Sequence, residues 1–276
     1  SALAIYCNAF LCGLARAHAP PLLDKAFAYL GKMRALSPED LGDGVVPSAL
    51  ARNNLIRTCA VVIRGVGLDG MEGGGHHQQQ HQQHSSLSRA RSQAIYSHTD
   101  SKKYVNLGEM LFDEYLQSAH EAIRRQPTNQ ALLRTYQTDT PPLLSSTIYL
   151  YCQAREHSKA IALFQRMREQ SFPCSTIPDA WAASGVIRAQ AHHSGPLEAW
   201  SLLQDLTKGP TPIEVILLPG LYKSLAHCIQ RQLAQGRHPV PQAQELRRLA
   251  HRVLTHMRHT AGLQPPLTLW RVLMKI

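Results

Sequence analysis

The chain has 276 residues, of which 44% are hydrophobic, and this is enough to bury the core of one large domain or of two smaller ones. Lys and Arg outnumber Asp and Glu by 29 to 19, and the formal net charge of +10 favours a polyanionic partner, nucleic acid before an acidic membrane surface. No run of about 18 apolar residues occurs, so the sequence predicts no membrane-spanning helix.

The first 64 residues predict one helix pair and the first helix of another. Apolar residues recur at three- and four-residue spacing over residues 5–17 and 24–36, and a turn at 44–48 closes this pair. The same spacing over residues 49–62 predicts the next helix. We interpret residues 1–64 as an N-terminal repeat region.

Residues 65–101 interrupt this pattern. The segment is rich in Gly, His, Gln and Ser, a composition that cannot support a packed core, so we predict a disordered low-complexity insertion. Four of its histidines lie close together in the sequence: His76, His77, His81 and His84. Such a group can capture a metal ion, but a solvated loop explains it better, and no metal site is predicted.

Helical spacing resumes in residues 102–276, a region of further predicted repeats with a basic C-terminal end. A helix over residues 102–125 is interpreted as the displaced partner of residues 49–62. A short helical segment over residues 129–136 follows, and the two prolines at 141–142 are expected to start the next helix.

Three more helix pairs are predicted, at residues 141–175, 180–206 and 217–263, and residues 265–276 begin one further helix. No alternating stretch indicates a strand. One pair of this size cannot bury both of its apolar faces, so the pairs must stack on like neighbours. The sequence therefore predicts an all-α fold, an irregular α-solenoid of about five helix-turn-helix repeats.

The helix pair YCQAREHSKAIALFQRMREQSF, at residues 151–172, resembles the pentatricopeptide repeat in its tyrosine–cysteine, alanine–apolar, leucine–phenylalanine and methionine positions. IYCNAFLCGL, at residues 5–14, resembles the first helix of that repeat, and GVVPS, at 44–48, resembles its closing turn. The related tetratricopeptide repeat requires an early tryptophan and a leucine–glycine pair, and no repeat here supplies that set. The resemblance weakens beyond residue 210.

The resemblance implies RNA binding in which each repeat reads one base. The reading positions are a polar residue near the start of the first helix and the residue that closes the repeat. They correspond to Asn8 with Ser48, Ser145 with Ser175, and singly Asn53 and Ser184. Asn and Ser can both donate and accept hydrogen bonds. The same residue types are also common helix caps, which is the structural alternative.

Basic residues collect at the C-terminal end of the chain. Arg248, Arg252 and His259 fall on one helical face, which suits phosphate contact or is simply a solvated surface. No HExxH, GxSxG, phosphate-binding loop or dinucleotide fingerprint occurs, so we predict no enzyme activity and no cofactor. The six cysteines form no CxxC pair, and buried reduced thiols explain them better than disulfides or a metal site.

These observations predict a non-catalytic RNA-binding helical-repeat protein of a mitochondrion or, alternatively, a chloroplast, the compartments that the resemblance implies. The irregular repeats, the insertion and the basic end suit a subunit of a ribonucleoprotein such as an organellar ribosome, with RNA and other proteins of that complex as partners. Two alternatives remain open. One is a protein-interaction scaffold that uses the same groove, and the other is a factor that matures or stabilises one transcript.

Overall fold

The computed structural model describes residues 8–13, 20–35, 47–67, 98–169, 179–208, 218–234 and 240–259, together with residues 264 and 270. Every secondary-structure element in these ranges is a helix, and none of them contains a strand, as predicted. The chain divides into two compact units, Ser1–Ala154 (unit 1) and Arg155–Ile276 (unit 2). Within the described ranges, no helix has the length and apolar character needed to cross a membrane.

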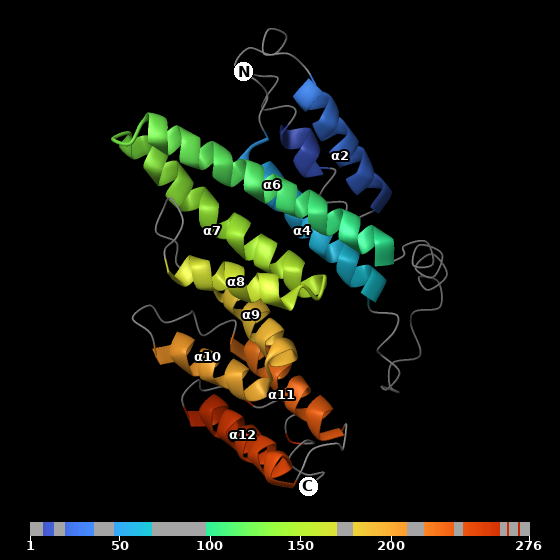
Figure 1. Cartoon of the computed structure of the whole chain (residues 1–276), viewed down its shortest axis with the longest axis vertical. Helices are drawn as coiled ribbons and strands as arrows, with labels where there is room; N and C mark the ends of the chain where they lie inside the picture. The colour runs from blue at the N-terminus through green and yellow to red at the C-terminus, as the bar shows by residue number, and fades with distance from the viewer. Residues whose placement is uncertain are drawn as a thin grey trace. The chain divides into compact units, whose positions relative to one another are not determined.

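The described residues of unit 1 form four long helices: α2 (Pro20–Ala35), α4 (Ala49–Gly67), α6 (His98–Arg125) and α7 (Gln130–Gln153). Helix α4 packs on α6 and on α7, α6 packs on α7, and α2 packs on α4 (Figure 1). The packing of α4 on α6 agrees with the predicted pairing of residues 49–62 with residues 102–125. Their shared core is aliphatic and aromatic, with fully or nearly fully buried side chains at Leu55, Ile56, Leu111, Phe112 and Ile148.

The structure describes only the two ends of the predicted insertion at residues 65–101. Helix α4 runs to Gly67 and α6 begins at His98, so helix covers both ends of the segment. Residues 68–97, with their four histidines, lie outside the described residues. Helices α6 and α7 pack back onto α4, so the helices on both sides of this segment belong to one compact unit.

The expectation that the prolines at 141–142 start a helix is wrong. Helix α7 begins at Gln130, where the Asn129 side chain caps it by accepting a hydrogen bond from the Leu132 N–H at 3.1 Å, and continues through both prolines. Interior prolines remove helix hydrogen bonds and disfavour the helix. Here the six residues from Leu143 to Ile148 are all buried, and α7 packs on α4 and α6. Tertiary packing therefore outweighs the local break.

Unit 2 contains five helices within the described residues: α8 (His157–Arg168), α9 (Ala180–His193), α10 (Pro196–Lys208), α11 (Leu218–Ala234) and α12 (Val240–His259). Helix α9 packs on α8, α10 and α11, and α12 packs on α10 and α11 (Figure 1). Small buried residues of α9, such as Ala182, Ala183 and Gly185, permit this crowding. The boundary between the units falls inside the pair predicted at residues 141–175, since α7 belongs to unit 1 and α8 to unit 2.

Candidate nucleic-acid interface

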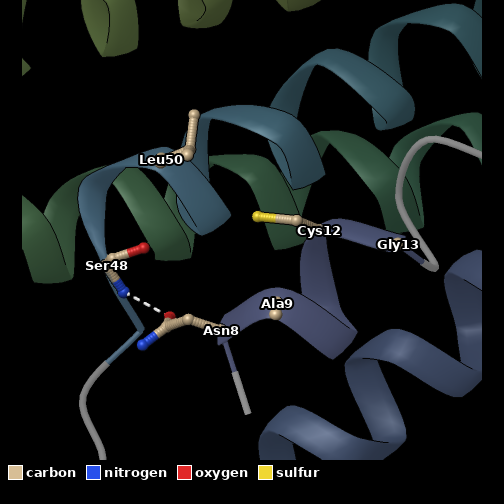
Figure 2. Close-up of a pocket in the computed structure, with 6 residues that line it drawn as sticks. All are labelled: Asn8, Ala9, Cys12, Gly13, Ser48 and Leu50. Atoms are coloured by element: carbon tan, nitrogen blue, oxygen red, sulfur yellow. Dashed lines mark hydrogen bonds between the residues drawn. The ribbon is translucent and has the colours of Figure 1, made fainter. Parts of the chain in front are cut away.

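Asn8 and Ser48, predicted as one base-reading pair, lie together in unit 1. The Ser48 backbone N–H donates to Asn8 Oδ1 at 2.7 Å, although the two residues are 40 positions apart. They line an open hollow of about 350 Å³, shown in Figure 2. Its lining residues are Asn8, Ala9, Cys12, Gly13, Ser48 and Leu50. This volume is at the small end of the range of about 300–1,000 Å³ that is typical of ligand pockets.

The hollow combines hydrogen-bonding groups with apolar surface. Ser48 is exposed, and its Oγ accepts the Ala51 N–H at 3.2 Å as the cap of α4, so the hydroxyl hydrogen remains able to donate. Leu50, in the first turn of α4, is 59% exposed and lines the hollow (Figure 2). A planar base needs such a pairing of a polar edge contact with an apolar face contact.

The Asn8–Ser48 bond also has a purely structural role. It joins the helical segment at residues 8–13 to the start of α4, and the whole of α2 lies between these two segments in the sequence. An asparagine side chain that only tied these segments together would show the same geometry. A functional test must therefore separate the carbonyl of Asn8, which makes this bond, from its amide nitrogen.

The other reading positions of unit 1 lie inside the helix packing. Asn53 of α4 is half-buried, and its Oδ1 accepts a hydrogen bond from the Ser146 hydroxyl of α7 at 2.6 Å. Ser145 is only 6% exposed, and its Oγ is buried without a hydrogen-bond partner in the described part of the chain. The prediction that Ser145 offers its hydroxyl to a base does not fit this burial, and Asn53 serves as a link between α4 and α7.

The remaining predicted serines give no second pair. Ser184 is half-buried on α9, the central helix of unit 2. Ser175 lies outside the described residues, so its predicted pairing with Ser145 has no structural counterpart here. Asn8 with Ser48 is the one predicted reading pair of which the structure describes both members, and both line the hollow.

The predicted basic face is present on α12. Arg248 and Arg252 lie one turn apart and are both exposed, while Leu246, Leu249 and Val253 are buried on the opposite side. The other exposed basic residues of the helix are Arg247, His251 and Arg258. Glu245 is the helix's one acidic residue, and within the described ranges neither Arg248 nor Arg252 has an ion-pair partner. The predicted companion His259 has no described side chain.

Cysteine placement agrees with reduced thiols where the structure describes it. Cys59, Cys152 and Cys228 are buried and free, and Cys12 is half-buried and free at the hollow. Burial raises the pKa of the Cys59 and Cys228 thiols, which keeps them protonated and unreactive. No group of three potential metal ligands occurs among the residues that the structure describes.

Sequence reasoning missed Leu50 and Cys12 as parts of the hollow. Leu50 had a usable signal, because it lies off the apolar face formed by Leu55, Ile56 and Cys59 of the same helix and is therefore expected at the surface. Cys12 had no such signal, since a thiol in an apolar helix is most often a core residue.

A comparison with protein-family models gives no match, and a comparison with curated proteins gives none either.

Proposed function

We propose that this chain is a non-catalytic RNA-binding protein whose helix pairs stack as an irregular α-solenoid. The observation that carries the proposal is the meeting of Asn8 and Ser48 at an open hollow. An asparagine and a serine were both expected to contact a base, and their contact places two short polar groups beside the exposed Leu50. A single unstacked base fits this combination of polar edge and apolar face.

The exposed arginines of α12 provide a second, sequence-independent contact in the proposal. Guanidinium groups bind phosphate oxygens in a bidentate geometry, and Arg248 and Arg252 lack a carboxylate partner within the described residues. A single-stranded nucleic acid bound in this way releases counterions, so its affinity falls as the salt concentration rises. In this proposal Asn8 and Ser48 of unit 1 select a base, and the α12 face of unit 2 separately binds RNA phosphates.

The cellular setting in this proposal is a mitochondrion or a chloroplast, and it rests on the resemblance to pentatricopeptide repeats. The uneven helix pairs and the boundary between two compact units suit a subunit of an organellar ribonucleoprotein, such as a ribosome, better than a long uninterrupted reader of RNA sequence. Such a subunit co-sediments with a ribosomal particle in a gradient. A transcript-specific factor instead binds one RNA sequence tightly as the free protein.

The variant Asn8→Asp tests the base contact. It keeps the side-chain oxygen that accepts the Ser48 N–H, but it replaces the amide donor with a charged acceptor. We expect filter binding to single-stranded RNA to weaken by about tenfold, the effect of one lost hydrogen bond to a buried base edge together with added repulsion. The matched control is Gln130→Glu, the same change of amide to carboxylate at an exposed position of unit 1. Equal RNA affinity for both variants would refute the proposed contact.

The double variant Arg248→Gln/Arg252→Gln tests the phosphate contact. For single strands each neutralised phosphate contributes about −0.7 to the slope of log affinity against log salt, so losing two contacts should make the slope shallower by about 1.4. Arg57→Gln, at an exposed position of α4, is the control for loss of a surface arginine. A slope that is unchanged in the double variant, or no measurable RNA binding by the parent chain, argues against the function.

The second candidate is a protein-interaction scaffold, and the exposed Trp181 favours it. This side chain is 56% exposed near the start of α9, and tryptophan is the residue type most enriched at binding hot spots. Trp181→Ala should abolish capture of a partner protein and leave RNA affinity unchanged. The opposite outcome, loss of RNA binding alone, assigns Trp181 to base stacking.

A further inference from the structure

A cluster of histidine, cysteine and arginine residues lies where α8, α9 and α11 pack together in unit 2. The ring of His157, the first residue of α8, stacks on the ring of His192, near the end of α9, with centroids 5.3 Å apart and planes inclined by 13°. Sγ of Cys228, on α11, lies 4.0 Å from Nε2 of His192. Three helices therefore meet at one pair of imidazole rings.

The charges of three arginines act on this pair. Arg188 lies one turn before His192 on α9, and Arg231 lies one turn after Cys228 on α11, so each shares a helix face with a member of the cluster. Arg155 is in the turn immediately before α8. Both Arg188 and Arg231 lie close enough to His192 for their charges to lower its pKa.

The charge of these arginines acts on the imidazoles. Burial and then the neighbouring charges of His192, His193, Arg155 and Arg188 lower the pKa of His157 to about 4. Burial, followed by Arg231, Arg188 and Arg155, also lowers the pKa of His192. No carboxylate of the described residues is among these causes, and Glu156, the nearest acidic residue in the sequence, is exposed. The cluster is thus a concentration of positive charge.

The fold leaves part of this charge uncompensated. Arg188 and Arg231 have no carboxylate partner within the described residues. Arg188 Nε and His157 Nδ1 are buried without a hydrogen-bond partner in the same part of the chain, and such groups are uncommon in folded proteins.

Arg155 directly follows Ala154, the C-cap of α7, and has an unusual backbone conformation for an arginine. Its φ angle of 63° is in the left-handed region, and among the described residues it is the one non-glycine with a positive φ. Glycine and asparagine adopt this conformation more readily than arginine, so an arginine at this turn carries strain. The left-handed conformation ends α7, as is common at helix C-termini, and it turns the chain toward α8.

We propose that this cluster is a phosphate-binding site, in which Arg155, Arg188 and Arg231 hold the oxygens of a phosphate group. The guanidinium fork matches phosphate geometry, and the bound anion supplies a negative partner for Arg188 and Arg231. The ligand is a phosphate ester, either a group of an RNA strand or a small phosphorylated molecule. The site stands on its own geometry and does not depend on the RNA contacts proposed for Asn8 and the α12 face.

Histidine NMR on the full chain tests the site. Inorganic phosphate is titrated against chloride at equal ionic strength, and the ring C–H resonances of the histidines are followed. We expect saturable shifts for His157 and His192, and a rise in the pKa of His157 from about 4, because the bound anion offsets the repulsion by the arginines. His256, whose ring packs on Trp200 at 5.4 Å in the same unit, should not shift.

Three variants separate binding from structure. Arg231→Gln, at an exposed position, should weaken phosphate binding by about tenfold, as expected for one lost charge-assisted contact. Arg155→Gly should weaken binding while keeping or raising the melting temperature, since glycine relieves the left-handed strain. Arg247→Gln, on the exposed face of α12, should leave phosphate binding unchanged. Resonances that do not shift with phosphate, or that shift equally in the Arg231 and Arg155 variants, would overturn the proposal.

The source of the phosphate is settled by a second titration with single-stranded RNA that carries or lacks a 5′-phosphate. Competition between inorganic phosphate and the RNA, lost in Arg231→Gln, assigns the site to nucleic acid. Shifts with inorganic phosphate but not with RNA assign it to a small phosphorylated molecule. Neither readout requires Asn8, so an Asn8→Asp variant that no longer binds RNA still reports on this cluster.

Discussion

The close approach of α6 to α7 at Gly108 gives a stability prediction with a defined sign. A Cβ atom on Gly108 would lie 2.3 Å from Leu150 Cδ2, far inside the normal carbon–carbon contact distance of about 3.5–4.0 Å. Leu150 is fully buried, so it cannot swing into solvent and must change rotamer within a packed core. Overpacking of this kind costs about 1–3 kcal/mol, whereas replacing Gly by Ala inside a helix contributes about 1 kcal/mol of stability.

For Gly108→Ala we therefore expect a loss of about 0–2 kcal/mol in the free energy of unfolding. The matched control is Gly31→Ala in α2 of the same unit, where an added Cβ meets nothing within 4 Å. That variant should gain about 1 kcal/mol, because only the helix preference operates. The two substitutions are chemically identical, so the difference of about 1–3 kcal/mol between them measures the close contact itself.

Urea unfolding followed by circular dichroism measures both variants. Because two compact units need not unfold together, hydrogen exchange on peptides from α6 and α7 should be used to assign the change to unit 1. In a Leu150→Ala background the obstacle is gone, and Gly108→Ala should become stabilising, which a double-mutant cycle detects. Equal stabilisation by Gly108→Ala and Gly31→Ala in the parent chain would refute the reasoning.

Three further predictions concern polar groups in the helix packing. Asn53→Ala should cost about 1–3 kcal/mol of unfolding free energy because it leaves the Ser146 hydroxyl unpaired, and adding Ser146→Ala should recover part of that loss in urea unfolding. Tyr115→Phe removes a buried hydroxyl contact to Thr140 and should cost about 1 kcal/mol, whereas no loss would show that the contact is dispensable. His157 has a folded pKa of about 4 against 6.5 when unfolded, so the unfolded chain binds the extra proton and stability should fall as the pH drops from about 6.5 to 4. His157→Gln should flatten the stability curve in that window, and an equally steep curve would contradict the assignment.

The positions of individual helices could be predicted from the sequence because the spacing of apolar residues along a short stretch indicates a helix. The apolar spacing of α8, α9 and α10 reproduces their observed positions, and the exposed arginine face of α12 follows from the spacing of Arg248 and Arg252. The local signal was misleading at residues 141–142, where proline favours a helix start. Burial of the following residues against α4 and α6 outweighed that preference.

The candidate site could be predicted only in part from the sequence. Ser145 occupies a position that suits base contact by resemblance, yet helices α4 and α6 both cover α7, and the hydroxyl is buried. Helical periodicity indicates which side of a helix is apolar. It does not indicate how much of the helix surface the neighbouring helices will bury. The pairing of Asn8 with Ser48 was expected from the resemblance, while the hollow beside it depends on how residues 8–13 meet α4.

The sequence by itself determined that the chain is basic, all-helical in the described residues and amphipathic helix by helix, because charge and periodicity are properties of neighbouring residues. Only the tertiary structure decided which polar groups meet. His157 and His192 stack beside Cys228 although they lie on three helices, and Asn53 finds Ser146 across 93 positions of sequence. Contacts of this range depend on the docking of whole helices, and no short stretch of sequence encodes that docking.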